Sequence, residues 1–369
     1  MALLSTLPAA DGFAMPAEFA PHRATVLIWP VRPGSWGWDP SAAQKAFLDV
    51  IREIAKGEDV YLLAGAADLA AAQAAAAGIP RVTVFEIESD DAWARDVGPT
   101  FVTDGRTLRG VSWKFNAWGG EVDGLYASWD KDDAVAADLC GKLGLDCYDA
   151  GDFVLEGGSI HVDGEGTLLT TEACLLSAGR NPQLSREEIE RKLADHLGIR
   201  KVLWLPRGIY QDETNEHVDN VCAFTAPGEV VLAWTDDQDD PQYPLSKACL
   251  DYLQTVTDAA GRRLKVRLLP IPDHPILCTE ADCAAYDFAP GEDMRQPGDR
   301  LAGSYANFYI ANSAVLVPQF GGENAASDAR ALGILREAFP GKRVVGIAAR
   351  AILLGGGNIH CITQQVPEV

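Results

Sequence analysis

Cys361 is the strongest candidate nucleophile in the chain. It follows three consecutive glycines at positions 355–357, whose backbone can approach a ligand closely or adopt positive φ angles. A thiolate attacks electrophilic carbon readily, although a single cysteine is more often a buried packing residue. His360 is adjacent, but neighbouring side chains on a strand point to opposite faces. The base that partners Cys361 is therefore expected from elsewhere in the chain.

Residues 215–220 offer such a base, because they include His217 and Asp219. If a strand begins at Val218, these two side chains project to the same side. A histidine beside a carboxylate suits proton transfer combined with electrostatic binding of a cation. A solvated turn is the alternative interpretation of this segment.

Two further motifs add an aromatic ring and more carboxylates. Trp93 and Asp96 stand at the entrance of a predicted hairpin, where an indole could cover a delocalised cation and a carboxylate could accept two parallel N–H bonds from a guanidinium. Arg95 is expected to pair with an acidic neighbour. Glu156 precedes two glycines and another hairpin. Because apolar residues flank it, we interpret it as a buried partner of His217 or of the substrate, with a surface turn residue as the alternative.

A repeated pattern predicts how these motifs are positioned. An apolar run, a turn, a second apolar run, an amphipathic stretch and a third apolar run recur at residues 159–205, 221–269 and 307–347, with looser copies at 24–63 and 99–144. Such ββαβ units cannot each bury an apolar face alone, so five of them should pack around one centre. We predict a closed five-fold α/β arrangement, a single catalytic domain over residues 1–369. An ordinary α/β protein with coincidental spacing is the alternative.

The four motifs occupy equivalent places in this arrangement, at the start of a hairpin or strand near the centre. Their convergence would bring together residues 93–96, 156, 217–219 and 361. The combined constellation is more specific than any single motif.

Composition limits the partners. The 53 acidic side chains outnumber 31 basic ones and give a net charge of −22, which disfavours nucleic acids and anionic membranes and favours a cationic substrate. Solubility alone is the alternative reason for this charge. No apolar run reaches the ~18 residues of a membrane span, and the N-terminal segment lacks the features of a signal peptide. The eight cysteines contain no CxxC pair, which predicts free thiols in the cytoplasm and no structural metal.

The sequence resembles the agmatine deiminases, bacterial-type peptidylarginine deiminase relatives within the guanidino-group-modifying, or pentein, superfamily. The resemblance covers nearly the whole chain and rests on motifs at residues 15–19, 29–30, 93–96, 113–120, 155–160, 212–220 and 355–365. It implies a five-bladed pseudo-symmetric α/β propeller that needs neither cofactor nor metal. The implied reaction is hydrolysis of agmatine to N-carbamoylputrescine and ammonia through a covalent thiouronium intermediate, in arginine-derived polyamine metabolism.

The resemblance also implies roles for individual residues. Cys361 would be the nucleophile and His217 the acid and base, while Asp96 and Asp219 would clamp the guanidinium and Glu156 would complete the polar core. The expected substrate contacts are Trp93, Gly356 and, at the far amine, Glu213.

Several alternatives stay open. A deiminase of free or peptidyl arginine would need an arginine or lysine clamp for the α-carboxylate, which the sequence does not identify. An amidinotransferase, a non-catalytic binding protein of the same fold and an unrelated Cys–His–Asp acyl hydrolase are the others. The sequence does not determine the oligomeric state, so a homo-oligomer is also open.

Overall fold

A repeated ββαβ unit builds most of the computed structural model, which describes residues 2–290, 292 and 294–369. Met1, at the start of the N-terminal segment considered above, lies outside the described residues. In one unit, β11 (Cys222–Ala226) and β12 (Glu229–Trp234) form an antiparallel hairpin, α9 (Gln242–Thr255) follows, and β13 (Lys265–Pro270) returns parallel to β12. A parallel return needs a crossover connection, and the helix supplies it.

Three other units have the same order and pairing. Their elements are β8 (His161–Val162), β9 (Thr167–Thr171), α8 (Arg186–Leu197) and β10 (Lys201–Leu205); β14 (Tyr309–Ile310), β15 (Ala314–Gln319), α11 (Ala325–Ala338) and β16 (Arg343–Ala348); and β5 (Thr100–Thr103), β6 (Leu108–Lys114), α6 (Asp130–Leu143) and β7 (Cys147–Val154). The pattern did not predict β7, which follows the copy at 99–144.

The fifth unit joins the two ends of the chain. The C-terminal strand β17 (Gln364–Pro367) pairs antiparallel with β2 (His22–Ile28), which is followed by α2 (Ser41–Ile54), the parallel strand β3 (Asp59–Ala64) and a further strand, β4 (Val82–Glu86). The copy predicted at 24–63 therefore takes its first strand from more than 300 residues away. Because Cys361 lies just before β17, this pairing also fixes the position of the candidate nucleophile.

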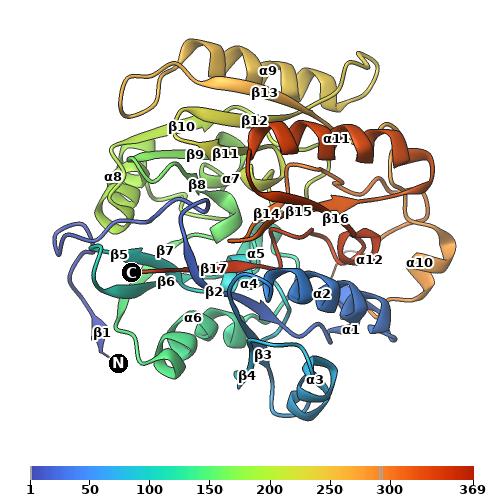
Figure 1. Ribbon diagram of the computed structural model, residues 1–369, viewed down its shortest axis with the longest axis horizontal. Helices are drawn as coiled ribbons and strands as arrows, with labels where there is room; N and C mark the ends of the chain where they lie inside the picture. The colour runs from blue at the N-terminus through green and yellow to red at the C-terminus, as the bar shows by residue number, and fades with distance from the viewer. Residues whose placement is uncertain (1, 291, 293) are drawn as a thin grey trace.

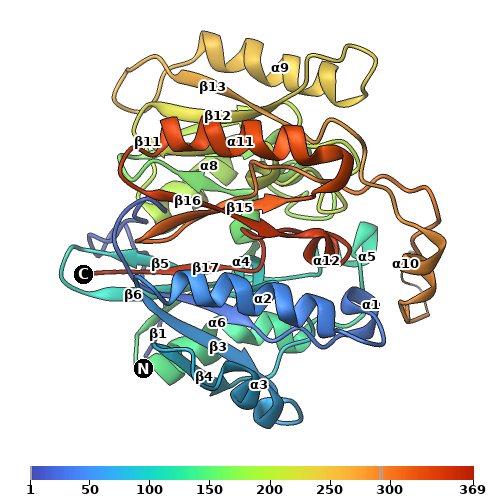
Figure 2. The same cartoon turned by 45° about the vertical axis from the view of Figure 1, so that its right-hand side comes forward.

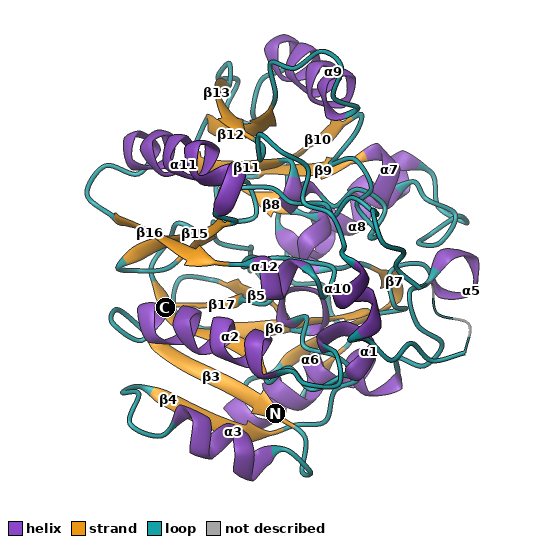
Figure 3. Ribbon diagram, turned by 90° about the vertical axis from the view of Figure 1, so that its right-hand side faces the viewer, coloured by secondary structure: helices purple, strands orange, loops and turns teal. Residues whose placement is uncertain are grey.

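In Figures 1 and 2 the molecule is seen from the side, with α9 and β4 at opposite ends. Figure 3 shows the five sheets around a common centre, with long helices such as α9, α11 and α2 towards the outside. The strand orders are β1-β7-β6-β5, β10-β9-β8, β11-β12-β13, β14-β15-β16 and β17-β2-β3-β4, where β1 is Leu3–Leu4. The first strands of the hairpins face the centre, and β17 contacts β5 while β11 contacts β8. The predicted five-bladed α/β propeller is confirmed.

Apolar patterning explains why these segments form blades. On α2, buried residues recur three or four positions apart, as in Ala43, Phe47, Val50 and Ile54, so one face of the helix packs on its sheet. The middle strand β12 is instead apolar throughout residues 230–233, because it is covered on both faces. In the described part of the chain, no helix is long and apolar enough to cross a membrane.

One side of the assembly carries the irregular segments (Figure 3). The short helices α1 (Pro33–Trp36), α5 (Gly120–Asp123), α10 (Glu280–Ala284) and α12 (Arg350–Leu353) gather there. The regular blades thus leave the connections between them to form a surface at one side, which is where binding residues are commonly placed on a rigid scaffold.

Loss of packing on β17 should destabilise the closed assembly. Val366 is 1% exposed, and Val366→Ala is expected to lower the free energy of unfolding by about 2 kcal/mol through lost apolar burial and the cavity left behind. Val369→Ala, at a half-exposed position beyond the strand, is the matched control and should have little effect. Urea denaturation measures both, and equal stabilities of the two variants would contradict the role given to this strand.

Candidate active site

A cavity of about 160 Å³ is lined by α1 and by the segments that follow the short helices α5, α10 and α12. Its inner end contains Cys361, His217 and Asp96, and its walls include four aromatic rings. The residues that line it are Arg32, Gly34, Ser35, Asp91, Trp93, Asp96, Trp118, Leu125, Tyr126, Glu213, Thr214, His217, Asn220, Phe288, Glu292, Arg295, Gly355, Gly356, Gly357 and Cys361. Of the eight residues singled out from the sequence, six line this cavity, and Asp219 and Glu156 lie behind its wall.

Cys361 lies in a turn between α12 and β17 and is 7% exposed. Its carbonyl accepts a hydrogen bond from the Arg95 backbone N–H at 3.1 Å. The Asn307 side chain lies against the sulfur, with Nδ2 3.2 Å from Sγ, and its Oδ1 accepts the His360 backbone N–H at 2.9 Å. A Cβ at Gly357 would stand 2.5 Å from the Trp93 ring and 3.1 Å from Sγ, so only glycine allows this close approach.

His217, Asp96 and Asp219 meet around one glycine. A Cβ at Gly158 would lie 2.6 Å from His217 Nδ1, 2.9 Å from Asp96 Oδ1 and 3.0 Å from Asp219 Oδ2. Residues from three different blades therefore converge on this point. The Glu156-Gly157-Gly158 turn therefore provides two features of the site: the space at Gly158, which has no Cβ, and the Glu156 carboxylate.

The expectation of a strand beginning at Val218 is wrong. Val218–Asn220 form a 3₁₀ turn with His217 at its N-terminal end, and β11 begins only at Cys222. Val218 is fully buried in the apolar core, which draws the backbone into the turn. His217 and Asp219 thus come together through the turn and not through strand alternation.

Asp96 is held through both of its oxygens. Trp118 Nε1 donates to Oδ2 at 3.0 Å, and the Gly158 N–H donates to Oδ1 at 2.8 Å. Burial raises the pKa of Asp96 to about 6, with a contribution from the nearby carboxylate of Asp219 and partial compensation by His217. The group is therefore ionised at neutral pH but protonates within a mildly acidic range.

Asp219 and Glu156 are each paired with a buried cation. His360 Nδ1 lies 2.8 Å from Asp219 Oδ2, and although burial raises the pKa of Asp219, this hydrogen bond and the charge of His360 lower it below its usual value. Glu156 is fully buried, with Arg180 Nε at 2.7 Å and His217 Nε2 at 3.8 Å. Burial raises the pKa of Glu156, but Arg180 and His217 lower it to about 2.

The resting site combines an imidazolium with a neutral thiol. Burial lowers the pKa of His217, but Asp96, the Cys174 thiol and Glu156 together raise it well above its ordinary value. Burial and the charges of Asp219 and Asp96 raise the pKa of Cys361 well above the usual value of a thiol, against the lowering effect of hydrogen bonds from Asn358 and Asn307. A cation bound against the two aspartates would offset their effect on the sulfur.

Trp93 forms a wall of the cavity and is fixed from behind. Its Nε1 donates to Asp91 Oδ2 at 2.9 Å, and its ring packs against Trp36 with centroids 4.9 Å apart. Asp91 also accepts from Trp36 Nε1 at 2.7 Å and from the Ser35 hydroxyl. The buried Asp91 carboxylate therefore sets the orientation of both indoles.

The outer end of the cavity holds charged pairs. Arg295 Nη2 lies 2.9 Å from Glu213 Oε2, and Arg32 pairs with Glu292 and, at 3.9 Å, with Asp91. Gly356 lies beside the first pair with a φ of +117°, a backbone conformation that favours glycine. Arg32 and Arg295 are the cationic groups in the cavity that the sequence pattern did not identify, and both are neutralised by carboxylates.

Other residues that hold the site were missed as functional candidates: Glu18, Asp91, Trp118, Arg180, Asn307 and His360. Asn307 could have been found, because it stands at the start of the third repeated unit, the place where the other blades carry their polar motifs. Arg180 could not, since it lies in a loop with no repeat position.

The family assignment follows from comparison with known proteins. The family model of Porphyromonas-type peptidyl-arginine deiminases matches residues 14–367. The chain belongs to this family. A curated relative from Selenomonas ruminantium is 55% identical over 372 residues and spans the full length of both proteins. The agmatine deiminase of Ectopseudomonas mendocina is 53% identical over 368 residues, covering 100% of this chain and 99% of that protein.

A solved structure of a family member has the same fold. The agmatine deiminase of Enterococcus faecalis, captured catalysing its reaction, superposes with a TM-score of 0.95 at 45% identity and covers 100% of this chain and 99% of that one. The resemblance to the agmatine deiminases within the pentein superfamily is thereby confirmed.

Removing one aspartate should make Cys361 more reactive in the free protein. Because the Asp96 carboxylate raises the pKa of the thiol, Asp96→Asn is expected to increase the rate of Cys361 alkylation by iodoacetamide at pH 7 by roughly tenfold, which corresponds to about one pKa unit. Mass spectrometry of the peptide that contains residue 361 measures this rate.

Glu213→Gln, at the outer end of the cavity, is the control for this measurement and should alkylate at the unmodified rate. An unchanged or slower rate in Asp96→Asn would show that this carboxylate does not govern the thiol.

Proposed function

We propose that this chain is an agmatine deiminase that hydrolyses agmatine to N-carbamoylputrescine and ammonia in polyamine metabolism derived from arginine. The observation that carries the proposal is the convergence of the buried Cys361 sulfur with Asp96 and His217 at the closed end of a small cavity, with Asp219 directly behind them and its Oδ2 3.6 Å from the sulfur. Two carboxylates beside one nucleophile suit a planar cation whose central carbon is to be attacked.

The first half of the reaction forms a covalent intermediate. Asp96 and Asp219 hold the guanidinium plane, and Trp93 covers it. With this cation in place the Cys361 thiol loses its proton to solvent, and the thiolate sulfur adds to the guanidinium carbon. His217, which is protonated in the resting site, donates its proton to the departing nitrogen. The C–N bond breaks, ammonia leaves, and an S-alkylthiouronium cation stays on Cys361.

The second half returns the enzyme to its starting state. His217 is now neutral and takes a proton from water, whose oxygen adds to the thiouronium carbon. The C–S bond then breaks and Cys361 leaves as a thiolate. The added oxygen loses its remaining proton to this thiolate as the urea group of N-carbamoylputrescine forms, which restores the neutral thiol beside a protonated His217. Glu156 and Arg180 keep the imidazole in place through both steps, since Glu156 lies 3.8 Å from His217 Nε2. The residues of the chain supply every group that this scheme needs.

The charge of the cavity favours a substrate with two cationic ends. Four carboxylates line it, Asp91, Asp96, Glu213 and Glu292, against the two guanidinium groups of Arg32 and Arg295. Agmatine carries an ammonium group at the far end, whereas arginine carries an α-carboxylate as well. Since Arg32 and Arg295 are already paired with Glu292 and Glu213, neither is free to clamp that carboxylate. This supports agmatine over free or peptidyl arginine.

The cytoplasm is the compartment that suits the proposed activity. The eight cysteines of the chain are free thiols in the structure, and the nucleophilic Cys361 is itself one of them. A reducing compartment preserves such thiols.

The Cys361→Ala variant should lose ammonia release from agmatine by about 10⁴-fold or more, because the covalent route is closed. Cys283→Ala, the control at a partly exposed thiol outside the cavity, should retain wild-type turnover. Ammonia assays with both variants check this, and circular dichroism verifies their folds. Near-normal turnover without the Cys361 sulfur would refute the covalent mechanism.

Substrate choice gives a separate test at the outer end of the cavity. The wild-type enzyme should turn over agmatine with a kcat/KM far above that for arginine or a peptidyl-arginine. Glu213→Gln should raise the KM for agmatine by roughly five- to tenfold with little change in kcat, since one partly exposed charge contributes about 1 kcal/mol. A preference for arginine in the same ammonia assay would replace the proposed substrate.

A further inference from the structure

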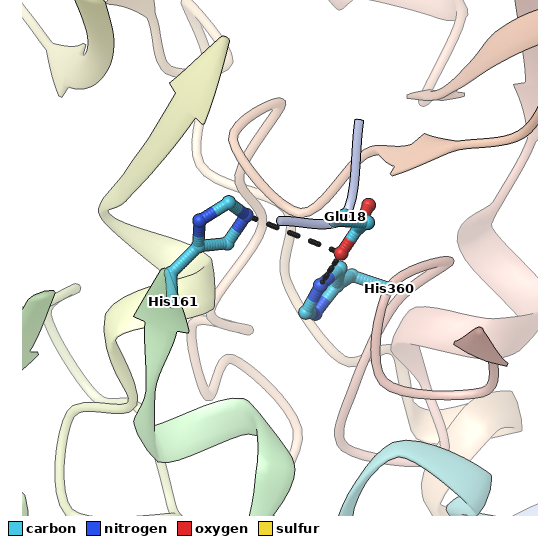
Figure 4. A group of neighbouring side chains, drawn as sticks. All are labelled: Glu18, His161 and His360. Carbon is cyan, nitrogen blue, oxygen red and sulfur yellow. Dashed lines mark hydrogen bonds and ion pairs between the residues drawn. The ribbon is translucent and has the colours of Figure 1, made fainter. Parts of the chain in front are cut away.

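His360 stands between two carboxylates behind the candidate nucleophile (Figure 4). Its Nδ1 lies 2.8 Å from Asp219 Oδ2 and its Nε2 lies 2.7 Å from Glu18 Oε2. All three side chains are at most 3% exposed. An ionised carboxylate only accepts hydrogen bonds, so each ring nitrogen must carry a proton for both contacts to form. The geometry therefore describes an imidazolium between two carboxylates.

The neighbouring His161 makes this cluster look like a metal site, but its hydrogen bonds argue against one. The Phe224 backbone N–H donates to His161 Nδ1 at 3.3 Å, so the ring proton is on Nε2, the nitrogen that faces Glu18 Oε2 at 4.0 Å. A metal ligand would need a lone pair on that nitrogen. In addition, Arg95 Nη2 occupies the space 3.3 Å from the same Glu18 oxygen. The Arg95 guanidinium therefore already provides positive charge beside Glu18, where a metal ion would have to bind.

Glu18 is itself held rigidly. Its second oxygen accepts the Ile310 backbone N–H at 2.9 Å, and Arg95, which bonds to it, also donates to Gln365 Oε1 at 2.6 Å. Glu18 precedes β2, Arg95 belongs to the turn that carries Trp93 and Asp96, and Gln365 lies on β17. The chain of contacts from Ile310 to His360 therefore ties several blades together behind Asp219.

The two oxygens of Asp219 differ in their hydrogen bonding. One oxygen is bound by His360, and the Cys361 thiol approaches that same oxygen at 3.6 Å. The other oxygen, Oδ1, is buried and has no hydrogen-bond partner among the described residues. A buried acceptor left in this way is costly unless a ligand supplies a donor. Oδ1 is the atom that a guanidinium N–H would satisfy.

We propose that His360 is a positioning residue that stays protonated, keeps Asp219 ionised and orients the free Oδ1 toward the substrate. The Glu18 and Asp219 carboxylates favour this state against the opposing charge of Arg95, whose contact with Glu18 keeps that carboxylate in place. The inference rests on the proposed function, because it assigns the clamp of the guanidinium to Asp219. In this arrangement the protonated His360, a fixed internal cation, keeps the Asp219 carboxylate ready to bind the cation of the substrate.

The pH dependence follows from the groups that face Asp219. They are His360, His217, Arg95, Asp96 and the Cys361 thiol, and among them His360 contributes most to lowering the pKa of Asp219 against the effect of burial. Without the cation at position 360, this pKa rises. Substrate binding needs both carboxylates ionised, and in the wild-type protein Asp96, whose pKa is about 6, sets the acid limb of kcat/KM. When His360 is made neutral, we expect the pKa of the equally buried Asp219 to rise to that of Asp96 or above, so the acid limb becomes steeper and moves to higher pH.

His360→Gln, which keeps a donor but removes the charge, should make the acid limb of kcat/KM for agmatine steeper, move its midpoint upward by about 0.4 pH unit or more, and raise KM more than it lowers kcat. His161→Gln, a neutral histidine of the same cluster without a bond to Asp219, is the matched control and should leave the acid limb in place. A uniform loss of activity at every pH in His360→Gln, with an unmoved acid limb, would overturn the proposal.

A second measurement needs no turnover and so separates this inference from the proposed function. Nitrogen NMR of ¹⁵N-histidine-labelled wild-type protein, with the resonance assigned through His360→Gln, should show both ring nitrogens of His360 protonated from pH 5.5 to 8.5. A neutral His360 at pH 7.5 would refute the positioning role even if agmatine is hydrolysed. Conversely, a protonated His360 in a protein inactive on agmatine would leave the cluster intact and refute the proposed substrate.

Discussion

The balance of buried charges around Cys361 is the constraint on which the rest of this site depends. Four carboxylates, Glu18, Asp96, Glu156 and Asp219, face four protein cations, Arg95, Arg180, His217 and His360. Buried ions are tolerated only when they are paired and hydrogen bonded, and here each has a partner of opposite charge. A neutral thiol completes this balance. A bound guanidinium adds one positive charge to this buried cluster. Loss of the thiol proton removes one positive charge and restores the balance. Binding of the cation and formation of the thiolate nucleophile are therefore coupled.

The propeller fold brings these buried charges together, because they lie on segments that are far apart in the sequence. Most of the charged groups come from the starts of different blades and from the turns before them, and Arg180 comes from the loop that follows β9 and precedes α8. Glycines at 158 and 357 leave the space that lets side chains from separate blades touch. The pairing of β17 with β2 closes the assembly and at the same time places Cys361 against Arg95 and Asn307. Closure of the fold and assembly of the site are thus the same structural step.

Much of this could be predicted from the sequence, since the ββαβ units repeat locally and their strands and helices follow ordinary apolar periodicity. The copy at 24–63 was incomplete because its first strand comes from the other end of the chain, which no local pattern reveals. The sequence pattern does not distinguish the turn at Val218–Asn220 from the start of a strand, because an apolar residue between two polar ones satisfies strand alternation equally well. Arg180, Glu18 and His360 act through contacts between distant segments, so their part in the site became visible only in three dimensions.

The coupling between cation binding and thiol ionisation can be measured directly. The ultraviolet absorbance of the thiolate, taken as the difference between the wild-type protein and Cys361→Ser, gives the pKa of Cys361 with and without a saturating guanidinium compound that is not turned over. We expect a thiol that is neutral at pH 8 in the free protein and a pKa of Cys361 that falls by about two units or more when the cation is bound. A pKa that is unchanged by the cation would contradict it.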